Sequence, residues 1–410
     1  MHLSNYQLSV KKERSAVLFL FLISFFSRIP VIFIFGDTHL DNEWGMIVNN
    51  LIAHNTLAFN YYDETLRFPS AYMPPLYAYY LYFFSFLNLE IANYIKTILL
   101  SQVLLSSISV ILFYKLNKFF FSKKISFYSS LFFSLIPLHL YACSQISSIS
   151  LQSFFSILFF YLYFLTVEKK NFSSIIYLSI VGSFLILLRG EFFAIFLLSL
   201  FFLIFFFKIP FRKILLIFSI TFIILSPYLI RNIVVFEEIV ITKSFGYNLW
   251  KGNNPNSTVE GNPQISNAIQ KKINLIPRNN QYGINFDQIF FEEAKKNIKE
   301  DPVKYINLFI KKFISFLFID INSSNPSYYN PLHYLPILIL SITSVIGIIL
   351  SDKKSNKLNL LIILFFVNIA IFSCFFILPR YKLVIISLQI IFTNIFVDFI
   401  RKKFFYSNEQ

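Results

Sequence analysis

Long apolar runs separated by short charged breaks make up most of this chain. The runs are about 17–25 residues long, the length that an α-helix needs to cross about 30 Å of hydrocarbon. They lack the apolar–polar alternation of a membrane β-barrel, and backbone groups inside lipid must find their hydrogen bonds within the chain. The pattern therefore predicts an all-α integral membrane protein with a bundle of about ten transmembrane helices.

Lysine and arginine side chains predict the orientation of these spans. They gather at the ends of alternate runs, and the positive-inside rule places those ends in the cytoplasm. We therefore expect a multi-pass protein of the inner (cytoplasmic) membrane, with both termini cytoplasmic and the long polar segments outside. The first run is too long for a removable signal and lacks its cleavage site, so we interpret it as an anchor. The predicted spans cover about residues 15–35, 91–114, 125–142, 149–167, two runs within 172–207, a run ending at Pro227, 333–350, 358–378 and 382–400.

The polar segments divide the chain into three predicted parts. Residues 1–230 form a membrane module with a catalytic first outer loop (36–90), residues 231–332 form an outer loop region, and residues 333–410 form the C-terminal transmembrane helices. Within the first outer loop, an aromatic run over 76–87 is too short for a span. It predicts a helix lying in the membrane interface.

The outer loop region contains two predicted helices. The first covers Asp287–Glu300, where Glu292 and Lys296 have the spacing of an i,i+4 ion pair. Asp301 is the predicted N-cap of the second helix, and Pro302 is its first residue. The apolar face of this second helix predicts an amphipathic surface helix.

Composition narrows the choice of partners. The chain has 410 residues, 56% of them hydrophobic, and a net charge of +15. Because the cations lie beside the spans, we attribute this charge to membrane orientation and predict no nucleic-acid partner. Cys143 and Cys374 lie in or beside apolar runs, which argues against a disulfide framework. Since His39, His54 and His139 lack metal-ligand spacing and the chain has no glycine-rich phosphate loop, we predict neither a metal nor a cofactor.

Acidic residues first gather in the loop after the first span. Asp37, Asp41, Glu43, Asp63 and Glu64 lie there, in a chain with 21 acidic residues in all. Charge is costly near hydrocarbon, so carboxylates beside a membrane span indicate a functional site.

Asp41 is predicted to begin a helix within this loop. Trp44, Ile47, Val48 and Leu51 follow at helical spacing and form one apolar stripe, which we expect to lie on the membrane surface. Asp41 then serves as the N-cap of this helix. The same fixed carboxylate is well placed as a general base, and the two roles are compatible.

Three arginines lie at predicted outer ends of spans, where the positive-inside rule disfavours cations. They are Arg189, Arg231 and Arg380. A guanidinium group binds phosphate in a bidentate manner, so a phosphate ligand is one explanation, and snorkelling to lipid headgroups is the other. The asparagine-rich loop 248–262 has two open interpretations, a binder of sugar hydroxyls and a flexible connector.

These residues and several short segments resemble a known family. The matching segments are Asp41…Trp44 with Leu51, Ser70-Ala71-Tyr72-Met73-Pro74-Pro75-Leu76-Tyr77, Leu188-Arg189-Gly190-Glu191, Pro227-Tyr228-Leu229-Ile230-Arg231-Asn232, Gly246-Tyr247-Asn248-Leu249-Trp250 with Gly252-Asn253-Asn254-Pro255, Ala294…Ile298…Pro302, and Arg380-Tyr381. In order and placement they resemble the bacterial multi-spanning glycosyltransferases of the GT-C fold. This superfamily (glycosyltransferase family 39-like) includes the protein O-mannosyltransferases and the lipid A aminoarabinose transferase.

The resemblance implies an inverting transfer from a polyprenyl-phosphate-linked sugar donor to a lipid, glycan or protein acceptor. It implies that an acid of the first outer loop is the catalytic base. We assign Asp41 as this base and Glu43 as its orienting or alternative acid, with Arg380, Arg231 and Arg189 as donor-phosphate ligands. The predicted substrate-binding residues are Tyr72, Tyr77, Asn248, Trp250 and Tyr381.

The chain departs from the family pattern in three places. Trp44 stands where tyrosine is commoner. Met73 precedes the proline pair where the aminoarabinose-transferase branch has a lysine. Gln145 and Gln152 occupy the region of an expected second acid.

Two other functions remain open at this point, a lipid-linked-sugar flippase or transporter and a non-catalytic subunit of an envelope-assembly complex. Transporters place ionisable or broken-helix sites near the bilayer midplane, often within internal repeats. Here the midspan regions are almost uncharged and the acids lie in loops, which favours the enzyme.

Overall fold

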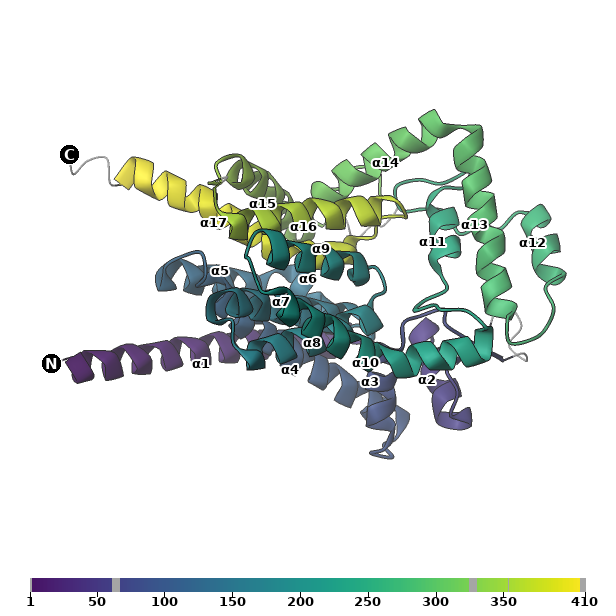
Figure 1. Ribbon diagram of the computed structural model, residues 1–410, viewed down its shortest axis with the longest axis horizontal. Helices are drawn as coiled ribbons and strands as arrows, with labels where there is room; N and C mark the ends of the chain where they lie inside the picture. The colour runs from purple at the N-terminus through teal and green to yellow at the C-terminus, as the bar shows by residue number, and fades with distance from the viewer. Residues whose placement is uncertain (1, 61–66, 324–329, 353, 406–410) are drawn as a thin grey trace.

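The computed structural model of the chain describes residues 2–60, 67–323, 330–352 and 354–405, most of them helical (Figure 1). The predicted loop acids Asp63 and Glu64 lie outside the described residues. The helices are α1 (His2–Phe35), α2 (Glu43–His54), α3 (Pro75–Ser85), α4 (Ile91–Asn117), α5 (Lys123–Leu135), α6 (Pro137–Ala142), α7 (Ile149–Lys169), α8 (Phe172–Leu188), α9 (Phe192–Phe205), α10 (Phe211–Phe236), α11 (Phe245–Gly252), α12 (Asn267–Asn274), α13 (Tyr282–Glu300), α14 (Pro302–Leu317), α15 (Pro331–Ile349), α16 (Asn356–Ser373), the 3₁₀ helix η2 (Pro379–Lys382) and α17 (Leu383–Phe405). The strands β1 (Ala58–Phe59) and β2 (Phe68–Pro69) pair antiparallel, with Ala58 opposite Pro69 and Phe59 opposite Phe68.

Seven helices in the described part of the chain are long and apolar enough to cross a membrane. They are Glu13–Phe35 within α1, then α4, α7, α10, α15 and α16, and finally Pro379–Lys403, which joins η2 to α17. The helical bundle of a multi-pass membrane protein is therefore confirmed.

By length and composition, seven of the about ten predicted spans are full spans in the described part of the chain. The other predicted spans correspond to α5, α8 and α9, which have 13, 17 and 14 residues, fewer than the about 20 that a span needs. The span predicted over 125–142 is broken because Pro137 starts α6, and the helix before it ends at Leu135. All three short helices still pack in the bundle, α5 on α4, α8 on α7 and α10, and α9 on α16.

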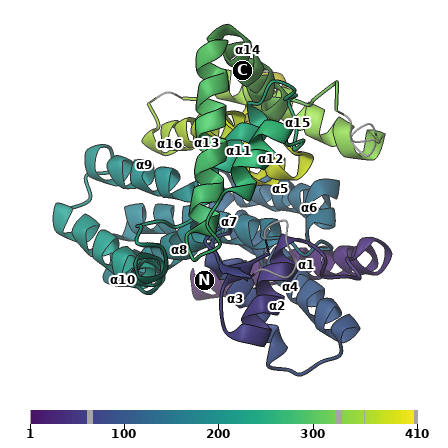
Figure 2. The same ribbon diagram turned by 90° about the vertical axis from the view of Figure 1, so that its right-hand side faces the viewer.

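Polar elements gather at one end of the bundle. The two chain termini lie at the left of Figure 1, whereas α2, α11, α12 and α13 lie toward the opposite end. Figure 2 looks at that end and shows α13 crossing it, with α11 and α12 beside α13 and with α2 and α3 below. The two long polar segments of the sequence therefore meet in space.

The cap of α2 corrects one prediction. Asn42, and not Asp41, is the N-cap, since its side-chain oxygen accepts hydrogen bonds from the backbone N–H groups of Trp44 and Gly45, each at 3.1 Å. Asparagine caps helices as well as aspartate does, and its amide also donates to the carbonyl of Ile146 at 3.0 Å. That second bond is one that an aspartate cannot form. It fixes the start of α2 to the turn after α6.

The apolar stripe of α2 also differs from its prediction. Trp44, Ile47, Val48 and Leu51 are all buried. They belong to apolar clusters shared with α3, so the stripe is a packing interface and not a membrane-facing surface. Helices α2 and α3 are therefore packed together at the polar end.

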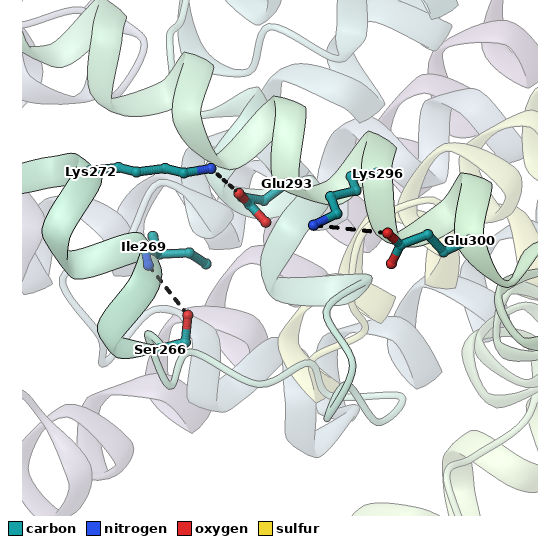
Figure 3. Close-up of polar contacts among 6 residues, drawn as sticks. All are labelled: Ser266, Ile269, Lys272, Glu293, Lys296 and Glu300. Atoms are coloured by element: carbon teal, nitrogen blue, oxygen red, sulfur yellow. Dashed lines mark hydrogen bonds and ion pairs between the residues drawn. The ribbon is translucent and has the colours of Figure 1, made fainter.

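The outer helices α12 and α13 are linked by surface charges (Figure 3). Lys272 of α12 pairs with Glu293 of α13 at 2.5 Å, and Ser266 caps α12 by accepting from the N–H of Ile269. Lys296 pairs with Glu300 at 3.9 Å, so the predicted Glu292–Lys296 pair is not the one that forms.

Helix α14 starts as predicted. The side chain of Asp301 accepts a hydrogen bond from the N–H of Lys304 at 3.0 Å, and Pro302 is the first helical residue. Tyr305, Leu308 and other apolar residues on one face are buried. This face packs on the spanning helix α16, and Lys312 lies buried among these residues.

Candidate active site

The acids of the first outer loop lie in two different environments. Asp37 is half-buried, and its carboxylate accepts a hydrogen bond from the N–H of Ile146 at 2.6 Å. Its own N–H donates to the carbonyl of Ser144 at 2.9 Å. Burial raises the pKa of Asp37, and the hydrogen bond from Ile146 opposes that rise. Asp37 is thus an anchor of the loop as well as an acid.

Asp41 and Glu43 are exposed and have no hydrogen bond or ion pair with any residue in the described ranges. Asp41 lines an open pocket of 390 Å³ whose other lining residues are Gly36, Asp37, Thr38, His39 and Asn42. Unpaired carboxylates fixed beside a pocket are available to accept a proton from a bound hydroxyl group.

The short helix α11 lies at the same end of the bundle as α2, and a buried acid holds its N-terminus. Asp287 of α13 is 4% exposed, and its carboxylate accepts a hydrogen bond from the N–H of Tyr247 at 2.9 Å. Burial raises the pKa of Asp287, and the hydrogen bonds from the N–H groups of Tyr247 and Gly246 oppose that rise. A Cβ added at Gly246 would lie 2.1 Å from the carbonyl oxygen of Asp287, so glycine permits the close approach of the two helices.

The C-terminus of α11 is fixed against the segment before η2. The side chain of Asn253 donates to the carbonyl of Cys374 at 2.8 Å, and the N–H of Ile377 donates to the carbonyl of Val259 at 2.9 Å. A Cβ at Gly252 would lie 1.9 Å from the carbonyl oxygen of Phe375.

A buried lysine completes this attachment. Lys312 is 0% exposed and donates to the carbonyl of Gly252 at 2.6 Å and to the side-chain oxygen of Asn253 at 3.3 Å. Burial lowers the pKa of Lys312 to about 7.

Three cations gather around two aromatic rings at the junction of α11 with η2. We call Arg189, Lys251 and Arg380 the cationic cluster. The ammonium of Lys251 lies 4.2 Å from the ring centre of Phe376, and the guanidinium carbons of Arg189 and Arg380 lie 5.9 and 5.8 Å from the ring centre of Tyr381. The two ring centres are 6.1 Å apart. Residues from α8, α11 and η2 therefore meet at one place.

Electrostatic interactions connect this cluster to the first outer loop. Burial lowers the pKa of Lys251, the charge of Arg380 lowers it further, and the carboxylate of Glu43 opposes both. Tyr141 lies within electrostatic range of both Asp37 and Arg380. Glu43 of the first outer loop and Lys251 of the cationic cluster are therefore within electrostatic range of each other at the polar end.

Arg189 has partners of its own. Its Nε donates to the side-chain oxygen of Gln152 at 3.0 Å and lies 3.7 Å from the carboxylate of Glu191. Gln152, which stands in the region of the expected second acid, therefore serves to orient an arginine.

Arg231 does not join the cluster as a free cation. Its guanidinium donates to the carbonyls of Leu57 and Ser70 at 3.0 and 3.2 Å and to the side-chain oxygen of Asn232 at 2.8 Å. These bonds hold the segments on either side of the β1–β2 pair. They use three of the five guanidinium N–H donors, which supports a scaffold role for Arg231.

Two of the predicted substrate-binding aromatics are core residues. Tyr77 is 0% exposed and donates its hydroxyl to Gln102 at 2.9 Å, and Trp250 is 2% exposed against Phe290. Tyr72 stacks on Phe59 with ring centres 4.6 Å apart.

The two remaining predicted substrate-binding residues are partly exposed near the site. Asn248 lies on α11, and Tyr381 lies between the two arginines of the cationic cluster. No group of three His, Cys, Asp or Glu side chains within the described ranges is placed to hold a metal ion.

Two features of the structure were not predicted from the sequence. Lys251 stands between two segments that matched the family, Gly246-Tyr247-Asn248-Leu249-Trp250 and Gly252-Asn253-Asn254-Pro255, and was assigned no role. Arg28 lies inside the first span and is fully buried, with its guanidinium bonded to Ser24, Ser106, the carbonyl of Ser134 and His139. A lone arginine within an apolar run was the signal for this intramembrane network.

Comparison with known proteins identifies the fold. No family model and no curated protein matches the sequence. Among solved structures, the apo form of the Archaeoglobus fulgidus oligosaccharyltransferase aligns with a TM-score of 0.53 at 12% identity, over 96% of this chain and 51% of that one. The same protein with an inhibitory peptide and a dolichol-phosphate aligns with a TM-score of 0.57 at 13% identity, over 96% and 51%.

A third structure of that enzyme, tethered to an acceptor peptide containing an NVT sequon, aligns with a TM-score of 0.56 at 11% identity, over 95% of this chain and 49% of that one. At such identities the likeness concerns the fold, and this chain spans about half the length of the structures it matches. The chain is a polytopic membrane protein with the GT-C-like fold that the sequence predicted.

Proposed function

We propose that this protein is a membrane glycosyltransferase that moves a sugar from a polyprenyl-phosphate donor to an acceptor hydroxyl at the outer face of the cytoplasmic membrane. The observation that carries the proposal is that the unpaired carboxylate of Glu43, two residues after the pocket-lining Asp41, lies within electrostatic range of Lys251 of the cationic cluster. The similar archaeal structures were solved with a dolichol-phosphate and with acceptor peptides. Those ligands support a lipid-linked donor here by analogy of fold.

The chemistry requires few groups. Asp41 accepts the proton of the acceptor hydroxyl, with Glu43 as the orienting or alternative acid, while the acceptor oxygen forms a bond to the anomeric carbon. The bond from that carbon to the phosphate oxygen breaks on the opposite side, which inverts the configuration. The leaving phosphate retains the electron pair, and Arg380 stabilises the negative charge that develops there.

The remaining parts of the proposal follow from the same arrangement. With the polar end outside, the termini at the other end lie in the cytoplasm. Residues 1–230 then supply the catalytic loop, residues 231–332 close the site from outside, and residues 333–410 supply Arg380 and Tyr381. The acceptor is a hydroxyl group of a lipid, a glycan or a protein.

The test has a cellular and a biochemical arm. Mass spectrometry of envelope glycans with and without the protein should reveal a missing sugar. Membranes containing Asp41→Asn should lose at least about a hundredfold in transfer, since general-base catalysis contributes about 10²–10⁴-fold. Glu90→Gln is the matched control because Glu90 is exposed and its side chain caps no helix. Full transferase activity in Asp41→Asn would refute the assignment of the base.

A lipid transporter is the second candidate, and the buried Arg28–His139 network inside the membrane is the observation that favours it. However, the guanidinium of Arg28 already forms hydrogen bonds with four residues of the bundle, namely Ser24, Ser106, Ser134 and His139. These bonds make it part of a closed structural network. Movement of a fluorescent polyprenyl phosphate across proteoliposomes without sugar transfer would select the transporter.

A further inference from the structure

Lys251 is an exception among the partly or fully buried lysines at this end. Lys312 donates to Gly252 and Asn253, and Lys382 donates to the carbonyls of Phe316 and Phe318. The ammonium of Lys251 carries three N–H donors. Within the described ranges it lies over the ring of Phe376 and donates no hydrogen bond to an oxygen. A half-buried ammonium without an acceptor in the described chain is available to bind an anion.

Arg380, beside Lys251 in the cationic cluster, also lacks a hydrogen-bond acceptor within the described ranges. Its guanidinium is exposed, lies over Tyr381, and makes no hydrogen bond or ion pair with the residues that the structure describes. Repulsion from Arg380 lowers the pKa of Lys251, and the carboxylate of Glu43 opposes that shift. An anion between like charges removes this repulsion, whereas Arg189 is already compensated by Glu191.

The elements that carry these cations cannot easily move apart. Asp287 holds the start of α11, Lys312 and Asn253 hold its end, and Lys382 fixes η2 to α14. Because these elements are held in place, the two cations can receive an anion without rearrangement.

We propose that Lys251 binds the phosphate of the donor together with Arg380, in the role that the sequence suggested for Arg231. This inference rests on the proposed function. During transfer, the anomeric carbon–oxygen bond breaks, the phosphate oxygen keeps the electron pair, and Lys251 donates a hydrogen bond to the phosphate as its charge grows. The acceptor proton leaves on the carboxylate of the first outer loop.

Three variants separate this role from packing. Lys251→Met keeps an unbranched apolar side chain over Phe376 and removes the charge, whereas Lys251→Arg keeps the charge. Lys304→Met is the matched control, because Lys304 also lies over a ring, that of Tyr305, but its ammonium already donates to the carbonyl of Pro255.

The measurement is binding of a sugar-free polyprenyl phosphate to the full-length protein in phosphatidylcholine nanodiscs, with the uncharged polyprenol as the blank. Loss of a charge-assisted hydrogen bond should weaken binding by about tenfold to a hundredfold in Lys251→Met. Lys251→Arg should restore most of the affinity, and Lys304→Met should bind as the wild type does. The same order in the KM for donor would support the assignment.

Two results would overturn it. If Lys251→Met binds polyprenyl phosphate like the wild type, Lys251 only packs on Phe376, and the proposed transferase still stands. If Lys251→Met and Lys304→Met weaken binding equally, the effect is general surface charge and no site exists at Lys251. Should the wild type prefer polyprenyl phosphate no more than polyprenol, the proposed donor fails together with this inference.

Discussion

Replacing the buried Lys312 by methionine tests how the site is held. Methionine has a similar shape, so the change removes an ammonium without leaving a large cavity. The carbonyl of Gly252 and the side-chain oxygen of Asn253 then lose their donor. An unsatisfied buried acceptor costs about 1–3 kcal/mol, so the two together give an upper value of about 6 kcal/mol and a realistic loss of about 3 kcal/mol.

The pH dependence of this loss has a definite sign. Burial lowers the pKa of Lys312 from the ordinary 10.5 to about 7. Between these values the unfolded chain binds more protons than the folded one, so the contribution of Lys312 to stability rises as the pH rises through about 7. Below pH 7 the wild type carries the full cost of the buried charge, on the order of a few kcal/mol, which the methionine variant does not have.

The assay is thermal unfolding in detergent at a fixed scan rate, for the wild type and Lys312→Met between pH 6 and pH 9. The wild type should exceed the variant most at pH 9, and the gap should narrow or reverse at pH 6. For Lys304→Met, at an exposed position of the same helix, the difference in unfolding temperature from the wild type should change little between pH 6 and pH 9. A gap that is independent of pH, or that is largest at pH 6, would refute the reasoning.

The other predictions concern residues whose contacts give distinct outcomes. Arg380→Met should reduce kcat by at least about a hundredfold, as loss of a transition-state donor does, without lowering the unfolding temperature, since its guanidinium is exposed. Arg231→Met should instead destabilise the protein by about 2 kcal/mol, because carbonyls of Leu57 and Ser70 lose their donor; a stable but inactive variant would contradict the scaffold role. Asn42→Ala should cost about 1 kcal/mol for the lost cap, and Asn42→Asp should restore only part of it, because the bond to Ile146 needs an amide.

The architecture was accessible from the sequence because its signals are local. Run length predicted the helical bundle, the short aromatic run over 76–87 predicted helix α3, and Asp301 with Pro302 predicted the start of α14. The two runs predicted within 172–207 correspond to α8 and α9. A proline interrupted the run predicted as one span over 125–142, because composition does not record where the hydrogen bonds of a helix end.

The site was less accessible because its determinants are distant in the chain. The partner of Lys312 is 60 residues away and that of Lys382 is 66 residues away, so neither lysine could be assigned a carbonyl acceptor from spacing. The same limit explains Asn42, since its preference over Asp41 depends on the carbonyl of Ile146, 104 residues along the chain. Tyr77 and Trp250 matched family segments, yet a segment match does not distinguish a buried aromatic from one that faces a sugar.

Buried charge is concentrated around the short elements that carry the cationic cluster. Asp287 caps α11, Lys312 holds the carbonyl at its end, and Lys382 neighbours Arg380 and binds the end of α14. Burying a charge is costly, and apolar residues of equal volume would stabilise these contacts at least as well. Apolar residues cannot form a directional hydrogen bond. A charged group that is bonded to one particular backbone atom fixes the position of that atom. We therefore expect apolar replacements at these positions to be tolerated better in stability measurements than in transfer or in polyprenyl phosphate binding, and equal losses in both would show that these charges serve folding alone.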